Sequence, residues 1–158
     1  MRTIHGELIT AGKEKWNHPA SCIFSGSSGT GKTELVFKLI RNQHFSKPIK
    51  HVFYFGCDNE HSHRLNWDTK LKDIAVTYEE GLPSSTFFSK IPKNSLVVID
   101  DQFYDAVNSS QLANAFTFDR RHRKFSIILI TQNLFEKGKY NKTIRNNSEI
   151  LVLFRNYG

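Results

Sequence analysis

The sequence has few cysteines and prolines and no long apolar run, and these absences exclude several classes of protein. Two cysteines, Cys22 and Cys57, cannot build a disulfide framework in a chain of 158 residues. Each lies in or beside a predicted core strand, where a reduced thiol acts as a small apolar filler, and this favours an intracellular compartment. No uninterrupted apolar run approaches the roughly 20 residues that cross a bilayer, and residues 1–12 lack the apolar segment of a signal peptide. We therefore expect a soluble, unexported protein without a membrane partner.

Length and charge set the next limits. A chain of 158 residues with only four prolines is long enough for one α/β domain and too short for two. We predict a single domain over residues 1–158, which is either minimal or lacks a C-terminal extension, because the last predicted strand lies so close to the end. The net charge of +7 favours an anionic partner, although a merely solvated basic surface explains it equally well.

Apolar runs alternate with helical patterns along the chain, which is the order expected of a parallel α/β sheet. Strands are predicted where β-branched and aromatic residues cluster, at residues 21–25, 51–56, 74–78, 96–99, 126–131 and 150–154. Apolar residues at helical spacing predict a helix over residues 34–43. A second helix is predicted up to about Arg121, with Ser109 or Ser110 as its N-cap. The predicted fold class is therefore α/β, with helices flanking a mainly parallel sheet.

The segment 26–33 (GSSGTGKT) fits the pattern G-x-x-x-x-G-K-[ST] of a phosphate-binding loop. A glycine- and serine-rich turn that happens to contain a lysine is the alternative. The predicted strand before the segment and the predicted helix after it favour the phosphate loop. The glycines would allow positive φ and a close approach of the backbone N–H groups to phosphates.

Particular side chains of the loop have particular roles in this prediction. Lys32 would reach the β- and γ-phosphates of ATP, and the Thr33 hydroxyl would coordinate Mg²⁺. The helix that begins near Gly31 would add the positive end of its dipole. The predicted nucleotide-binding residues are Gly26, Ser27, Ser28, Gly29, Thr30, Gly31, Lys32 and Thr33.

Polar side chains follow two of the predicted strands. Asp100 and Asp101 end the strand at 96–99, and we assign Asp100 to Mg²⁺ and Asp101 to the attacking water. A helix cap or a loop residue is the alternative for Asp101. Gln132 follows the strand at 126–131, so its amide is predicted to contact the γ-phosphate or the water at the carboxyl edge of the sheet.

Two further groups of residues could carry chemistry. Arg120, Arg121, Arg123 and Lys124 form a basic run before the strand at 126–131. We name Arg121 as the candidate finger that a neighbouring subunit would supply in a ring, against the alternative of a solvated helix end whose cations complement the dipole. Cys57, His61 and His63 could suggest zinc, but a fourth ligand is missing, so a polar loop is the simpler interpretation.

The second half of the chain resembles a known family of motors. The succession GLPSS, NSLVVIDDQF, RRHRKFSIILITQNLFEKGKY and TIRNNSEILVLFRN is similar to the genome-packaging ATPases of double-stranded DNA viruses and Polinton-type transposons, within the FtsK-HerA superfamily of P-loop NTPases. With the phosphate loop included, the resemblance covers most of the chain. Its most specific part is the ITQN element at 130–133, which follows the arginine-rich helix.

The resemblance implies a RecA-like core with an additional strand, assembly into a homo-oligomeric ring, and ATP-driven translocation of double-stranded DNA into a capsid. A virion or an infected host cell would be the setting, with a capsid protein as a further partner. Lys32, Thr33, Asp100, Asp101 and Gln132 match the residues of the family's motifs. Two departures are the early end of the chain and an Asp-Asp pair in place of Asp-Glu.

The leading hypothesis is therefore an ATPase motor that translocates double-stranded DNA. A helicase or helicase loader is the alternative enzyme, and DNA-stimulated hydrolysis without strand separation would distinguish the motor from it. The alternative from another class is a nucleotide-dependent binding protein that hydrolyses ATP negligibly. Tight binding of ATP with no turnover would favour that protein.

Overall fold

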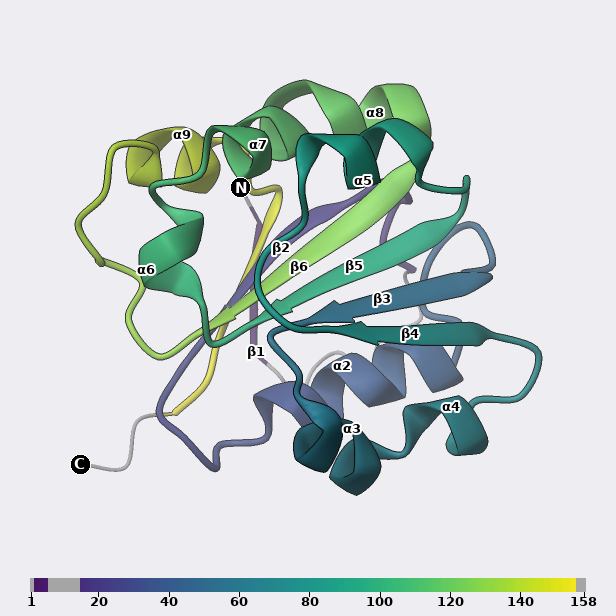
Figure 1. Cartoon of the computed structure of the whole chain (residues 1–158). Helices are drawn as coiled ribbons and strands as arrows, with labels where there is room; N and C mark the ends of the chain where they lie inside the picture. Colours follow the sequence, from purple (N-terminus) through teal and green to yellow (C-terminus); the bar gives the residue numbers. More distant parts are fainter. Residues whose placement is uncertain (1, 6–14, 156–158) are drawn as a thin grey trace.

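In the computed structural model, which describes residues 2–5 and 15–155, one parallel sheet of seven strands lies between two layers of helices (Figure 1). The strand order is β1-β7-β2-β6-β5-β3-β4, and every pairing is parallel. The strands are β1 Arg2–His5, β2 Ser21–Ser25, β3 His51–Phe55, β4 Ala75–Glu79, β5 Ser95–Asp100, β6 Phe125–Thr131 and β7 Ile150–Leu153. The six predicted strands are confirmed to within two residues, while β1 was not predicted.

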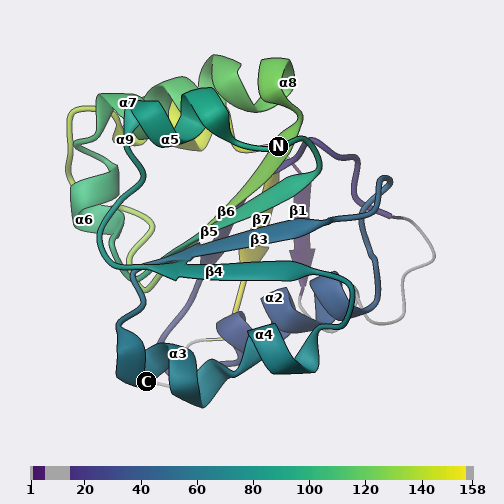
Figure 2. The same ribbon diagram turned by 45° about the vertical axis from the view of Figure 1, so that its right-hand side comes forward.

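Helices cover both faces of the sheet, and both views of the ribbon show this arrangement (Figures 1 and 2). One face carries α2 Lys32–Arg41, α3 Asn59–Leu65 and α4 Trp67–Lys70. The other face carries α5 Ser85–Lys90, α6 Phe103–Ala106, α7 Ser110–Asn114, the π-helix η1 Ala115–Asp119, α8 Arg120–Arg123 and α9 Asn141–Asn146. The two predicted helices are therefore present, and the second is divided by the π-helical segment.

The core has two halves because successive residues of a strand face opposite sides of the sheet. In β5, Leu96 and Val98 join the cluster under α2, while Val97 and Ile99 join the cluster under α5 to α9. Burial on both faces explains why this strand and β6 read as continuous apolar runs. Cys22 and Cys57 are both buried with free thiols, as the sequence predicted. Among the described residues, no helix has the length and apolar character to cross a membrane.

The strand order decides where the loops meet. The strand β6 lies between β2, which precedes the segment 26–33, and β5, which ends in Asp100. This is the additional strand of a RecA-like core. Because all three strands are parallel, their carboxyl ends lie at one edge of the sheet, where ligands of open α/β folds bind.

Candidate nucleotide-binding site

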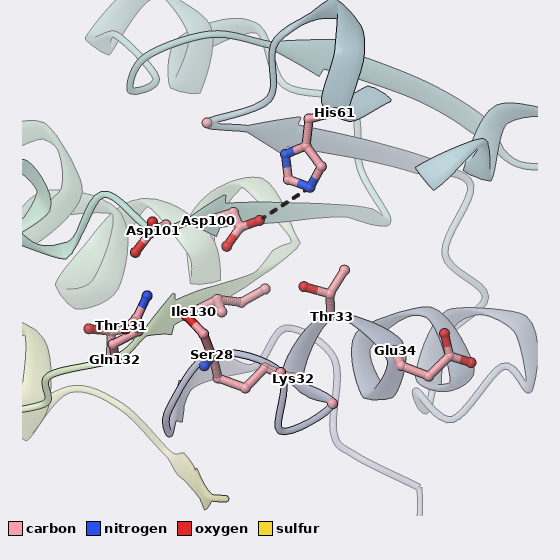
Figure 3. A pocket seen from close by; sticks show the side chains of 13 residues that line it. Ser28, Lys32, Thr33, Glu34, His61, Asp100, Asp101, Ile130, Thr131 and Gln132 are labelled. Atoms are coloured by element: carbon pink, nitrogen blue, oxygen red, sulfur yellow. Dashed lines mark ion pairs between the residues drawn. The ribbon is translucent and has the colours of Figure 1, made fainter. Parts of the chain in front are cut away.

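A cavity of about 530 Å³ lies at the carboxyl edge of the sheet, a size ordinary for a small-molecule site. Its walls come from three parts of the chain: the loop between β2 and α2, the ends of β5 and β6, and the segment that follows β3 (Figure 3). The lining residues are Ser28, Gly29, Gly31, Lys32, Thr33, Glu34, Gly56, His61, Asp100, Asp101, Ile130, Thr131 and Gln132. The fold thus brings residues predicted from three separate motifs to one place, although Gly26, Ser27 and Thr30 of the predicted loop are not among the lining residues.

The loop has the backbone that an anion nest requires. Gly29 and Gly31 have φ values of 75° and 96°, in the left-handed region that suits glycine, and α2 begins directly after Gly31. Gly26 is needed for a different reason than we expected, since it is not among the residues with positive φ. A Cβ at Gly26 would lie 2.6 Å from the Cβ of Phe154, so a larger residue would push the loop away from the end of β7.

Lys32 lies inside the loop, with little of its side chain exposed. Its Nζ donates hydrogen bonds to the carbonyl oxygens of Gly26 and Ser27, at 2.5 and 2.8 Å. Burial lowers the pKa of Lys32, and the nearby charges of Asp100 and Asp101 oppose that shift. An incoming phosphate would compete with these two carbonyl groups of the loop for the ammonium.

Asp100 is the last residue of β5 and is largely buried. Its Oδ2 accepts a hydrogen bond of 2.5 Å from the Tyr54 hydroxyl and lies 4.0 Å from the Nε2 of His61. Burial raises the pKa of Asp100, while the hydrogen bond from Tyr54 and the charges of His61 and Lys32 lower it. The desolvated carboxylate therefore gains from any cation that enters the cavity.

Asp101 and Gln132 lie on the side of the cavity next to β6 (Figure 3). Asp101 adopts a left-handed conformation with φ of 53°, which aspartate tolerates better than most residues. Its backbone N–H donates to the carbonyl of Ile130, so the turn after β5 is tied to β6. Both side chains are exposed at the cavity, where a water molecule could reach them.

The residues present fit a magnesium ion. The Thr33 hydroxyl and the Asp100 carboxylate line the same cavity, and Mg²⁺ is commonly held by one or two protein oxygens together with substrate phosphates. A dedicated cage of protein ligands is not required for such a site. The assignment of Thr33 and Asp100 to Mg²⁺ stays a prediction, and the oxygen donors of both residues suit that ion.

The structure does not bring the arginines of α8 to the cavity. The helix α8 precedes β6 and so lies at the amino edge of the sheet, opposite the loop (Figure 1). Arg120 is buried in an ion pair with Glu149, whereas Arg121 is exposed. Arg121 cannot reach the cavity of its own chain, so its role as a finger stays a prediction that requires a second copy.

Sequence reasoning missed two residues of the site. The segment with His61 is the helix α3 rather than a polar loop, and the imidazole points into the cavity (Figure 3). Tyr54 was assigned only to a strand, although its hydroxyl meets Asp100. The available signal was positional: both residues lie in or just after β3, the parallel neighbour of β5.

Together, the parallel sheet with its additional strand, the loop from Gly26 to Thr33 and the acidic end of β5 define the fold of the RecA-like P-loop NTPases, and this chain has that fold. No protein-family model matches the chain, and no curated protein matches it.

Solved structures with the same fold are similar at low sequence identity. The genome packaging NTPase B204 of Sulfolobus turreted icosahedral virus 2, solved in complex with ATP-gammaS, is 14% identical with a TM-score of 0.58, over 89% of this chain and 77% of that one. The cytoplasmic domain of EssC is 16% identical with a TM-score of 0.60, over 89% of this chain but only 32% of that one. The flagellar accessory protein FlaH of Methanocaldococcus jannaschii is 18% identical with a TM-score of 0.55, over 87% and 72%.

Proposed function

We propose that this chain is a Mg²⁺-dependent ATPase that works as a subunit of a motor translocating double-stranded DNA, of the viral genome-packaging type. The observation that carries the proposal is the convergence of the phosphate loop, the two aspartates and Gln132 on one cavity. The net charge of +7 supports a polyanionic partner, and the resemblance of residues 81–156 to packaging ATPases supports the type of motor.

Each side chain has a defined part in the reaction. The loop N–H groups and Lys32 bind the phosphates and stabilise the charge that develops on the γ-phosphoryl group. Magnesium, held through Thr33 and Asp100, would neutralise charge on the phosphate oxygens. Gln132 orients a water molecule, and Asp101 accepts its proton as the new bond to the γ-phosphorus forms and the bond to the bridging oxygen of ADP breaks.

A protein that binds ATP without hydrolysing it is the second candidate. The observation that favours it is the residue at position 101, because aspartate is one methylene shorter than the glutamate that often follows the metal-binding aspartate. Its exposed carboxylate lines the cavity, and this shorter side chain has to reach the attacking water. Turnover therefore has to be measured separately from binding.

Steady-state ATP hydrolysis, measured with and without duplex DNA, tests the proposal. We expect DNA to stimulate turnover, and we expect Lys32→Ala and Asp101→Asn each to reduce it by about 100-fold. Lys38→Ala on the same helix and Asp105→Asn on α6 are matched controls that keep wild-type turnover, because neither residue lines the cavity. Tight binding of ATP with no turnover, with or without DNA, would establish the second candidate instead.

A further inference from the structure

The buried tyrosine of β3 is placed to hold the carboxylate of Asp100. Tyr54 pairs with Val98 of β5, and Asp100 lies two residues beyond Val98, so the side chains of Tyr54 and Asp100 are on the same face of the sheet. The phenol ring is completely buried and packs edge-on against Trp67, at 5.1 Å between ring centroids. Its hydroxyl donates to Oδ2 of Asp100 and also interacts with the side chain of Thr33.

His61 contacts the same pair from the cavity side. Its ring packs edge-on against Tyr54, at 5.8 Å between centroids, and its Nε2 lies 4.0 Å from the same Oδ2. The position of the ring is set by α3, whose first turn is capped when the Asp58 carboxylate accepts a hydrogen bond from the His61 N–H. Both contacts to Asp100 therefore come from the β3 side of the cavity. Both are made to the same oxygen, Oδ2.

The orientation of Asp100 follows from these contacts. Oδ2 is engaged by Tyr54, and the Asp100 carboxylate lies above the part of the cavity lined by Lys32 and Thr33 (Figure 3). A cation shared with the Thr33 hydroxyl would meet a carboxylate whose Oδ2 is already held by Tyr54. Without a donor on Oδ2, the carboxylate could rotate, and a buried acceptor would lose its partner.

We propose that Tyr54 and His61 are positioning residues that hold the Asp100 carboxylate in the orientation that binds Mg²⁺, Tyr54 through its hydrogen bond and His61 through its contact with the same oxygen. This inference rests on the proposed Mg²⁺-dependent nucleotide binding and adds two residues to it. Partners that orient a metal-binding side chain commonly change metal affinity by about tenfold or more when they are removed. Neither residue belongs to the loop or to the acidic strand end.

The test separates metal binding from nucleotide binding. Calorimetric affinity for the analogue ATP-gammaS is measured in the presence of EDTA and across a Mg²⁺ titration, for the wild type, Tyr54→Phe and His61→Gln. We expect Tyr54→Phe to leave the affinity in EDTA unchanged and to raise the half-saturating Mg²⁺ concentration about tenfold. His61→Gln should raise the half-saturating Mg²⁺ concentration only about threefold, because the contact that it removes is longer than that of Tyr54 and the His61 ring is partly exposed.

A double-mutant cycle shows whether Tyr54 acts through Asp100 or only through packing. In an Asp100→Asn background, Tyr54→Phe should have no further effect on the dependence on Mg²⁺, because the carboxylate that it positions is gone. Tyr104→Phe is the matched control, since this tyrosine is 64% exposed on α6 and does not line the cavity. Thermal unfolding of each variant reports any loss of folding.

The outcomes distinguish the inference from the function on which it rests. Mg²⁺-dependent binding by the wild type that stays unchanged in both variants would overturn the inference and leave the proposed function standing. Equal effects of Tyr54→Phe with and without the Asp100 carboxylate would also overturn it. A wild type whose affinity for the nucleotide does not respond to Mg²⁺ would overturn both.

Discussion

Arg120 lies inside the protein although it belongs to a run of basic residues. Its side chain is 1% exposed, and its guanidinium donates to Glu149 at 2.5 Å, to the carbonyl of Phe116 at 3.2 Å and to the carbonyl of Pro19 at 3.4 Å. Pro19 precedes β2, Glu149 precedes β7 and Phe116 belongs to η1. The side chain of Arg120 therefore links the helical layer to the sheet. Its neighbour Arg121 is exposed. Adjacent arginines in one run thus have different roles.

The difference between the two arginines can be measured as stability. Arg120→Gln leaves three acceptors without their donor, so we expect it to lower the free energy of unfolding by about 2 kcal/mol, less than for a fully buried pair because the Glu149 side chain is 43% exposed. Arg121→Gln is the matched control and should change the free energy of unfolding by less than about 0.5 kcal/mol. Urea unfolding followed by circular dichroism checks both, and equal effects would contradict the assignment.

The helical layer from Ser110 to Arg123 shows how an element departs from its sequence pattern. The spacing of Leu112, Ala113 and Phe116 predicted one helix, and the chain is helical throughout this stretch. Five residues, Ala115–Asp119, nevertheless form a π-helix, which accommodates one extra residue in the turn. The spacing of apolar residues along the sequence does not reveal such an insertion, because the insertion depends on how the helix packs on the sheet.

The start of this element offers a sharp test. The sequence left Ser109 and Ser110 as equal candidates for the N-cap, and the structure selects Ser109, whose Oγ accepts a hydrogen bond from the N–H of Leu112 at 3.2 Å. Ser109→Ala should therefore lower the free energy of unfolding by about 1 kcal/mol. Ser110→Ala is the control and should cost much less. A thermal denaturation series checks this, and a larger effect at Ser110 would show that the other serine is the cap.

At the scale of the whole molecule, the cavity and Arg121 lie at opposite edges of the same sheet. A head-to-tail arrangement of copies would bring the amino edge of one subunit to the carboxyl edge of the next, and a closed ring results when the rotation closes. The proposal of a ring therefore gives Arg121 a possible target that its own chain lacks. A solvated helix end remains the alternative for this arginine.

Mixing two inactive variants tests that arrangement. Arg121→Ala should reduce turnover by at least about 100-fold, as the loss of an arginine finger does, while a mixture with Lys32→Ala should regain part of it. In the mixture, a copy with an intact loop can receive Arg121 from a copy whose own loop is inactive. Arg123→Ala serves as control, because that arginine donates to the carbonyl of Ser89 within its own chain. Wild-type turnover by Arg121→Ala alone would exclude the finger.

The sequence by itself determined the class of fold and most of the candidate site. The segment 26–33, the apolar strand that ends in Asp100 and the apolar strand that precedes Gln132 are local patterns, because a phosphate loop and a buried parallel strand require particular residues at consecutive positions. Parallel strands also place their carboxyl ends at one edge, so the convergence of these residues was predictable.

Only the tertiary structure decided the neighbours of each residue across the sheet. The contact of Tyr54 and His61 with Asp100 depends on the pairing of β3 with β5, the burial of Arg120 depends on Glu149, and the need for glycine at position 26 depends on Phe154. These partners lie between 29 and 128 residues apart along the chain, as the numbering shows. Contacts over such separations leave no local periodicity in the sequence, so only the packing of distant segments decides which residues meet.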